Sequence, residues 1–152
     1  MKRKAVDKLL GELRGLSLSH IWRGYGSAIF CEFGTLRATY RRDGSLGAPA
    51  GIMSLMIEWS WRIERGDRIL CGSWSDDQHW SDVFSELLDA KVTQASLFGR
   101  IPEIEVSLSN GARILSFMTG EGLPAWTLFD RRGSFESWLS VENDGLEINR
   151  KL

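Results

Sequence analysis

The sequence predicts a single α+β domain, residues 1–152, made mainly of antiparallel β-structure with two short helices. Three observations predict this fold class. The length of 152 residues suits one domain. A content of 43% hydrophobic and 26% charged residues is typical of a folded globular protein. Alternating apolar and polar residues recur in short segments, whereas helical periodicity occurs twice. We therefore expect a two-layer sandwich or a strongly curved, barrel-like sheet.

The first elements come in the order helix, strand, strand, strand. Residues 5–13 have the spacing of a short amphipathic helix, and Gly15 is a suitable stop. Residues 19–23 and 28–33 are expected to be two strands joined by a glycine-containing turn. Residues 35–41 alternate apolar and polar side chains, which predicts a third, half-buried strand.

A loop and a long strand are expected next. Residues 42–51 contain three glycines and a proline, which predicts a long mobile loop. Residues 55–63 then give the strongest β-signal in the chain, because five large apolar side chains occupy alternate positions. These side chains are Leu55, Ile57, Trp59, Trp61 and Ile63. We predict one continuous strand that buries this face and turns at 65–67 into a hairpin with 69–74.

The rest of the chain is predicted as one helix followed by strands. Residues 75–88 form the helix, with Ser75 or Asp76 as its cap. The Asn110-Gly111 pair is a strong hairpin signal. The expected strands are 103–108, 113–118, 125–129, 135–139 and 146–148.

The two halves of the chain show a similar order of elements, at about 5–75 and 83–150. Each half has a helix with a Leu-Leu pair, then a pair of strands, a loop with Gly and Pro, and a strand with Trp. Either an internal duplication or chance similarity among β-rich segments explains this order. A duplication predicts two similar sheet units around an approximate twofold axis, each with a helix at one edge.

Charge differs between the halves although the net charge is only −1. Residues 1–75 carry 12 Lys/Arg and 7 Asp/Glu, and residues 76–152 carry 7 and 13, so the halves hold +5 and −6. Opposite charges attract across one sheet system, or they steer a partner or favour head-to-tail association. The small net charge predicts no binding to nucleic acid or to an anionic membrane.

Other features point to a cytoplasmic protein. The basic N-terminus lacks the apolar segment of a secretory signal, and the longest uncharged run is too short to span a bilayer. Cys31 and Cys71 each lie in an apolar, strand-like segment, where a free cysteine usually acts as a small core residue. Two cysteines do not make a disulfide framework, so we expect a reducing compartment.

The sequence offers little catalytic chemistry. His20 and His79 are the only histidines, and neither lies beside a nucleophile motif. Asp76, Asp77 and His79 have some metal-ligand character, but helix capping accounts for the two acids. We therefore predict no enzyme activity, no cofactor and no metal.

Seven tryptophans are the unusual feature of the composition. Trp22, Trp74 and Trp80 lie near turns or a helix end, and we expect one or two of them to line a surface groove. Glu58 and Arg62 fall on the face opposite the apolar stripe of 55–63, where they form either a polar patch beside such a tryptophan or a simple ion pair. These five residues are the candidate binding residues.

Four segments, 9–13, 29–33, 58–61 and 106–111, resemble in pattern the small uncharacterised bacterial β-rich domains that include immunity-type proteins of toxin systems. This resemblance implies a small cytoplasmic protein that works by binding, and it transfers no functional residue. The expected function is a non-catalytic interaction with a protein partner or by self-association, for example as a homodimer. The alternative is a small-ligand or carbohydrate-binding domain, in which tryptophans and the loop at 43–51 frame a pocket.

Overall fold

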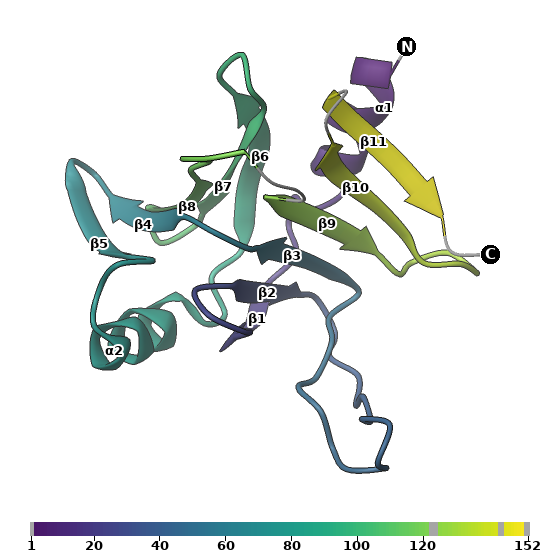
Figure 1. The fold of residues 1–152 in the computed structure, drawn as a ribbon, viewed down its shortest axis with the longest axis horizontal. Helices are drawn as coiled ribbons and strands as arrows, with labels where there is room; N and C mark the ends of the chain where they lie inside the picture. Colours follow the sequence, from purple (N-terminus) through teal and green to yellow (C-terminus); the bar gives the residue numbers. More distant parts are fainter. Residues whose placement is uncertain (1, 122–124, 143–144, 151–152) are drawn as a thin grey trace.

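The computed structural model describes residues 2–121, 125–142 and 145–150. These residues form two helices, α1 (Lys2–Gly11) and α2 (Asp77–Leu87), and two antiparallel sheets (Figure 1). The six-stranded sheet has the order β1-β2-β3-β9-β10-β11 and the five-stranded sheet the order β5-β4-β8-β7-β6. The predicted α+β class with two sheet layers is confirmed, and neither sheet closes on itself among the described strands.

The strands of the six-stranded sheet are β1 (Leu18–Arg23), β2 (Ile29–Phe33), β3 (Met53–Ile57), β9 (Trp126–Asp130), β10 (Ser137–Glu142) and β11 (Gly145–Arg150). The strands of the five-stranded sheet are β4 (Trp61–Arg65), β5 (Arg68–Gly72), β6 (Val92–Phe98), β7 (Glu103–Leu108) and β8 (Ala112–Ser116).

The predicted continuous strand at 55–63 is wrong. The chain leaves the six-stranded sheet at the end of β3 and enters the five-stranded sheet at the start of β4. The described residues of a second crossing, 117–121 and 125 between β8 and β9, lie beside the first. Hydrogen bonds join the two crossings, from Glu58 N to Ala125 O at 2.8 Å and from Phe117 N to Ser60 O at 2.8 Å. Trp59 lies in the first crossing and is 55% exposed, so it leaves the buried face on which the alternation placed it.

The two sheets repeat the same plan. Strands β1, β2, β3, β9 and β10 follow one another in the first sheet as β6, β7, β8, β4 and β5 do in the second. The joins at the centre also match, since β3 pairs with β9 and β8 pairs with β4 over five residue pairs each. Each half of the chain therefore supplies a three-stranded meander to one sheet and an antiparallel pair, β4–β5 or β9–β10, to the other. We call this the twofold correspondence. Strand β11 is an additional edge strand from the second half and has no counterpart in the five-stranded sheet.

The linkers between helix and first strand obey the same correspondence. Ser17 and Lys91 form an antiparallel bridge. On one side Gly15 N donates to Val92 O at 2.8 Å, and on the other Asp89 N donates to Leu18 O at 2.8 Å. Gly15 and Asp89 are the matching residues, and both have positive φ, at 87° and 70°. Asp89 is the one described non-glycine residue in this left-handed conformation.

Helices α1 and α2 precede corresponding linkers, but the leucines that correspond in the structure are not the predicted Leu-Leu pairs. Leu13 and Leu87, both fully buried, each lie two residues before the positive-φ residue of their linker. The Leu9-Leu10 pair thus does not correspond to Leu87 and Leu88. The unit boundary expected at residue 83 also falls inside α2. A duplication of the sequence stays a prediction, and the twofold correspondence is the structural observation that favours it.

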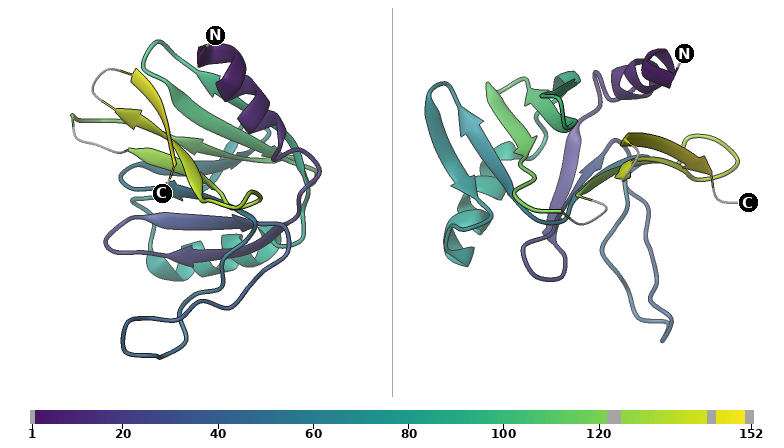
Figure 2. Two further views of the ribbon diagram at one scale, coloured as in Figure 1. Left: turned by 90° about the vertical axis from the view of Figure 1, so that its right-hand side faces the viewer. Right: turned by 45° about the horizontal axis from the view of Figure 1, so that its top comes forward.

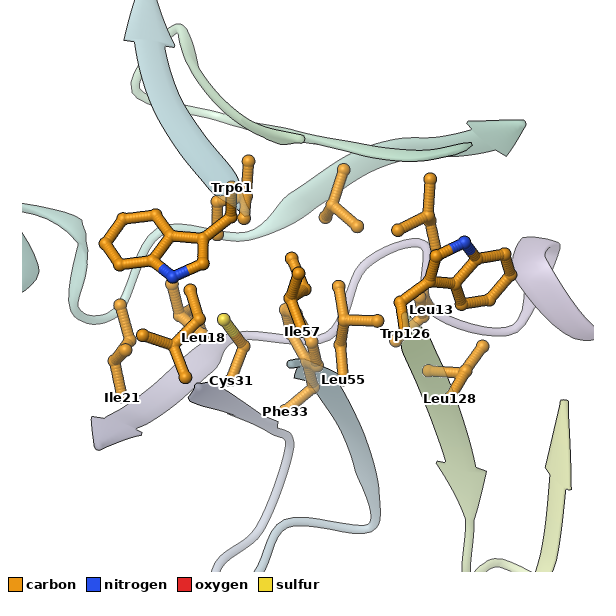
Figure 3. Packing of buried hydrophobic residues seen from close by; sticks show 14 of the residues in the cluster. Leu13, Leu18, Ile21, Cys31, Phe33, Leu55, Ile57, Trp61, Trp126 and Leu128 are labelled. Atoms are coloured by element: carbon orange, nitrogen blue, oxygen red, sulfur yellow. The ribbon is translucent and has the colours of Figure 1, made fainter. Parts of the chain in front are cut away.

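Two buried tryptophans occupy corresponding positions in the core. Trp61 and Trp126 are 2% and 0% exposed and lie at opposite ends of the labelled cluster, with Ile57 between them (Figure 3). The indole N–H of Trp61 donates to Ser27 O at 2.7 Å, and that of Trp126 donates to Pro102 O at 2.9 Å. The acceptor carbonyls lie in the β1–β2 and β6–β7 connections, which correspond. Each indole therefore ties the first strand after a crossing to the other sheet's meander.

One further expectation about the first half is wrong, because residues 35–41 do not form a strand. Residues 42–51 contain no helix or strand, in agreement with the predicted loop. Together the two segments form an arm, residues 35–51, that projects from the body of the molecule between β2 and β3 (Figures 1 and 2). Its two sides are joined by reciprocal hydrogen bonds between Arg37 and Ala50, at 2.8 and 3.0 Å, and by Gly47 N to Thr39 O at 2.8 Å.

The other elements agree with the sequence prediction except at two places. Strand β6 was not predicted, because Thr93 and Gln94 expose their side chains and leave too few apolar residues for a clear alternation. Helix α2 begins without the expected side-chain cap: Asp76 is the N-cap residue but makes no capping hydrogen bond. Ser75 Oγ instead accepts a hydrogen bond from Gly72 N at 3.0 Å.

Candidate functional site

A cleft of about 410 Å³ opens where the two sheets exchange strands. Four connections meet there: the β1–β2 turn, the two crossings, and the segment between β5 and α2. The lining residues are Ser27, Trp59, Ser60, Ser73, Trp74 and residues 118–121. The volume is within the range of roughly 300–1,000 Å³ that is usual for small-molecule pockets.

Trp59 forms one aromatic wall of the cleft. Ser27 fixes its backbone, because the Ser27 hydroxyl donates to Trp59 O at 2.7 Å while Ser27 O accepts the indole N–H of Trp61. The neighbouring Glu58 N is held by Ala125 O. The main chain at Trp59 is therefore anchored from both sides, and its side chain is directed away from the core.

Trp74 forms the second aromatic wall and is 96% exposed. It sits in a tight turn between β5 and α2. This turn is closed by Ser75 N donating to Gly72 O at 2.9 Å and by Gly72 N donating to Ser75 Oγ at 3.0 Å. Neither Trp59 nor Trp74 is in a ring pair with another aromatic side chain among the described residues. Both indoles are therefore available to a ligand.

Hydroxyl groups and one carboxylate supply the polar part of the cleft. The hydroxyls of Ser60 and Thr119 lie 3.3 Å apart, across the two crossings. Ser73 Oγ accepts from Trp61 N at 3.4 Å, which brings this hydroxyl to the rim as well. Glu121 is exposed and places an anionic acceptor on the lining. The cleft thus combines flat apolar rings with groups that both donate and accept hydrogen bonds.

Of the predicted binding residues, Trp74 lies in the cleft and Trp22 and Trp80 do not. Trp22 stacks on Phe30 with ring centroids 4.1 Å apart, and its N–H donates to Glu32 at 2.9 Å. Trp80 is buried in α2 and meets Trp61 edge-on at 4.8 Å. Trp80 is therefore not one of the tryptophans that line a groove, because its ring completes the core beneath the helix.

Glu58 and Arg62 do not form a pair. Arg62 Nε binds Glu64 at 2.8 Å, and its guanidinium lies 4.4 Å from the centre of the Phe117 ring. Glu58 belongs to the first crossing, whereas Arg62 belongs to β4, so the sheet exchange separates them. The polar patch expected from these two residues is therefore not formed.

Trp59 was not among the predicted binding residues, and the loop does not lie where the prediction placed it. Trp59 fitted the alternation of the buried stripe, and no local signal marked the crossing. The loop at 43–51, which was expected to frame a pocket with the tryptophans, is part of the arm and contributes nothing to the lining of the cleft.

The cysteines and the candidate metal ligands have structural roles. Cys31 and Cys71 are free and buried. Burial raises the pKa of the Cys71 thiol to about 12. Burial, with the nearby Glu32 carboxylate, also raises the pKa of Cys31. His79 Nε2 lies 2.5 Å from Leu70 O. In the described part of the chain, no group of three or more His, Cys, Asp or Glu residues is arranged to hold a metal ion.

The arm is the second surface feature that stands apart from the core. Tyr40 and Leu46 face each other as a bridge pair near its tip and are both exposed. The Arg41 guanidinium donates to Leu46 O at 2.5 Å and to Ser45 Oγ at 3.3 Å. These contacts hold apolar side chains in a fixed place without covering them.

No helix among the described residues is both long and apolar enough to cross a membrane. Comparisons with protein-family models, with curated proteins and with solved structures find no match to this chain.

Proposed function

We propose that this protein is a non-catalytic binding protein whose ligand site is the cleft between Trp59 and Trp74. The observation that carries the proposal is the exposure of two indoles on a cleft whose backbone is anchored by hydrogen bonds. Exposing a tryptophan side chain to water is energetically unfavourable, and tryptophan is enriched at the binding sites of proteins. A binding function accounts for both rings.

The state of the nucleophilic groups supports binding rather than chemistry. A thiol reacts as the thiolate, and burial keeps Cys31 and Cys71 protonated at neutral pH. Both thiols are buried in the core, and neither lines the cleft. Two free, buried cysteines also suit a reducing compartment, and we propose the cytoplasm.

The test is a ligand screen that uses the tryptophans as reporters. In heteronuclear NMR each indole N–H gives its own signal, and single Trp→Phe variants assign these signals. We expect hits from a chemically mixed small-molecule library to shift the signals of Trp59 and Trp74. Their affinity should fall about tenfold or more, equivalent to roughly 1.4 kcal/mol, in Trp74→Ala.

Tyr25→Ala is the matched control because Tyr25 is also an exposed aromatic residue, 99% accessible, but lies outside the lining of the cleft. It should leave the affinity unchanged. Hits that shift neither indole, or that bind Trp74→Ala as well as the parent protein, would show that the cleft is not the binding site.

A second candidate function, interaction with a protein partner or with a second copy, is favoured by the arm. The hydrogen bonds between the two sides of the arm hold Tyr40 and Leu46 exposed in one conformation. A partner would therefore bind these side chains without the entropic cost of ordering a loop. A toxin partner, as in an immunity pair, is one form of this proposal.

Sedimentation velocity and quantitative co-purification from the native host test the arm. A Tyr40→Ser, Leu46→Ser double variant should lose self-association or one specific partner, while Tyr25→Ser keeps it. Equal association by both variants would exclude the arm as an interface.

A further inference from the structure

We propose that the cleft binds a neutral carbohydrate, with a sugar ring stacked on the indole of Trp74. This proposal rests on the function proposed above and names the chemical class of its ligand. Three features of the cleft favour this ligand class: its exposed rings, its hydroxyl groups and the carboxylate of Glu121.

The rings provide the stacking surface. A pyranose has a face made of C–H groups that is apolar and slightly positive, and the face of an indole carries the negative end of its quadrupole. Trp74 is almost wholly exposed and Trp59 is half exposed, so both can present ring surface to a ligand. Their main chains are fixed by the Gly72–Ser75 turn and by Ser27, which lowers the cost of ordering them on binding.

The hydroxyls match the edge of a sugar. Each sugar hydroxyl is both a donor and an acceptor, and so is each Ser or Thr hydroxyl. Ser60 and Thr119 lie within 3.3 Å of each other on adjacent crossings and form one polar edge of the cleft. Their mutual hydrogen bond uses only part of this capacity, so a ligand hydroxyl can bridge them.

Glu121 selects among ligands that stack on tryptophan. A carboxylate only accepts hydrogen bonds, and it forms strong ones with hydroxyl donors. A proline-rich peptide would also stack on tryptophan, but proline has no N–H to offer Glu121. An anionic ligand would be repelled. A neutral polyol satisfies the carboxylate, the hydroxyls and the rings together.

The experiment titrates the full chain with glucose, galactose, mannose, N-acetylglucosamine, maltose, cellobiose and lactose at millimolar concentrations. A proline-rich peptide and glucuronate are run beside them. Heteronuclear NMR of the indole signals and calorimetry give the affinity. We expect saturable binding of at least one neutral sugar, with shifts confined to Trp59, Trp74 and the main chain of the lining.

Variants separate stacking from general apolar contact. Trp74→Tyr keeps a flat ring and should retain most of the affinity, whereas Trp74→Leu keeps apolar surface without a ring and should lose about tenfold or more. Thr119→Val removes one hydroxyl at nearly constant shape and should weaken binding several-fold. Trp74 and Thr119 are not core residues, and unchanged circular dichroism checks that each variant folds.

Each outcome decides the matter. Sugar binding that is equal in Trp74→Tyr and Trp74→Leu would overturn the stacking argument. If no sugar binds but the peptide, glucuronate or another library compound shifts the indoles of Trp59 and Trp74, the carbohydrate proposal fails and the binding function stands. If no compound of any class shifts either indole, both proposals fail.

Discussion

Removing the indole nitrogen of Trp61 tests the central structural argument. Trp61→Phe keeps an aromatic ring in the core but removes the N–H that donates to Ser27 O at 2.7 Å. It therefore breaks the tie between the start of β4 and the β1–β2 turn. Trp126→Phe removes the corresponding bond to Pro102 O at 2.9 Å. Because the two sites correspond, the two variants should behave alike.

The magnitude follows from burial. Both hydrogen bonds are only partly buried, so each Trp→Phe change should lower the free energy of unfolding by the net contribution of one hydrogen bond, about 0.5–1.5 kcal/mol. Trp61→Ala also removes the core volume and should cost about 3–5 kcal/mol. The edge-on contact with Trp80, at 4.8 Å, is worth roughly 0.5–1.5 kcal/mol beyond burial and places Trp61→Ala at the upper end of that range.

Urea denaturation followed by far-UV circular dichroism measures these differences without depending on tryptophan fluorescence. Trp74→Ala is the control, because its exposed side chain should change the free energy of unfolding by less than about 0.5 kcal/mol. A midpoint for Trp61→Phe equal to that of Trp74→Ala would refute the role of the indole bond. A large cost at Trp61 with none at Trp126 would refute the equivalence of the two sites.

Three further predictions concern the linker, pH and the thiols. Gly15→Val should lower the free energy of unfolding by about 1–2 kcal/mol through its positive φ alone, since a Cβ there meets no atom within 4 Å. Gly15→Asp should lower it by less, because Asp89 adopts the matching conformation. Equal urea midpoints for the two variants would contradict this. The hydrogen bond from Arg132 lowers the pKa of Asp130, so the folded state holds this proton less tightly than the unfolded chain. The resulting stability is present above the ordinary Asp pKa of about 3.9 and is lost as the pH falls through the lower folded value. The stability gap between the parent and Asp130→Asn should therefore narrow on acidification, and a gap independent of pH would count against the ion pair. Burial raises the pKa of Cys71 to about 12. Its alkylation by iodoacetamide near pH 8, followed by mass spectrometry, should therefore be much slower in the native protein than in urea. Equal rates of alkylation would mean that the thiol is accessible.

The sequence was sufficient for local elements and insufficient for their pairing. Alternation found most strands, and the Asn110-Gly111 signal correctly predicted the β7–β8 hairpin. The stripe at 55–63 misled because Leu55, Ile57, Trp61 and Ile63 do share one core, although they lie in two sheets. Alternation reports which side is buried, and it carries no information on which strand is the neighbour.

Only part of the candidate site could be predicted, because local patterns do not show where the chain crosses between the sheets. Trp74 was found because it lies in a turn, where burial is rare. Trp80 also lies near a helix end, but the helical periodicity places it on the same face as Val83 and Leu87. All three side chains on this face are buried, so the periodicity was the better guide to the position of Trp80. Trp59 could be recognised only once the sheet crossing was known, since nothing local distinguishes it from Trp61.

The exchange of strand pairs between the two sheets has a consequence for how the chain can be divided. A fragment that ends after β5 keeps the meander β1-β2-β3, but β3 loses β9, and the β4–β5 hairpin loses β8. Both would then present bare strand edges, which readily pair with another chain. Such a fragment would not fold as half of a protein. In the full chain the link between β5 and α2 keeps β8 and β9 in the same molecule as those edges, so each edge pairs within one chain.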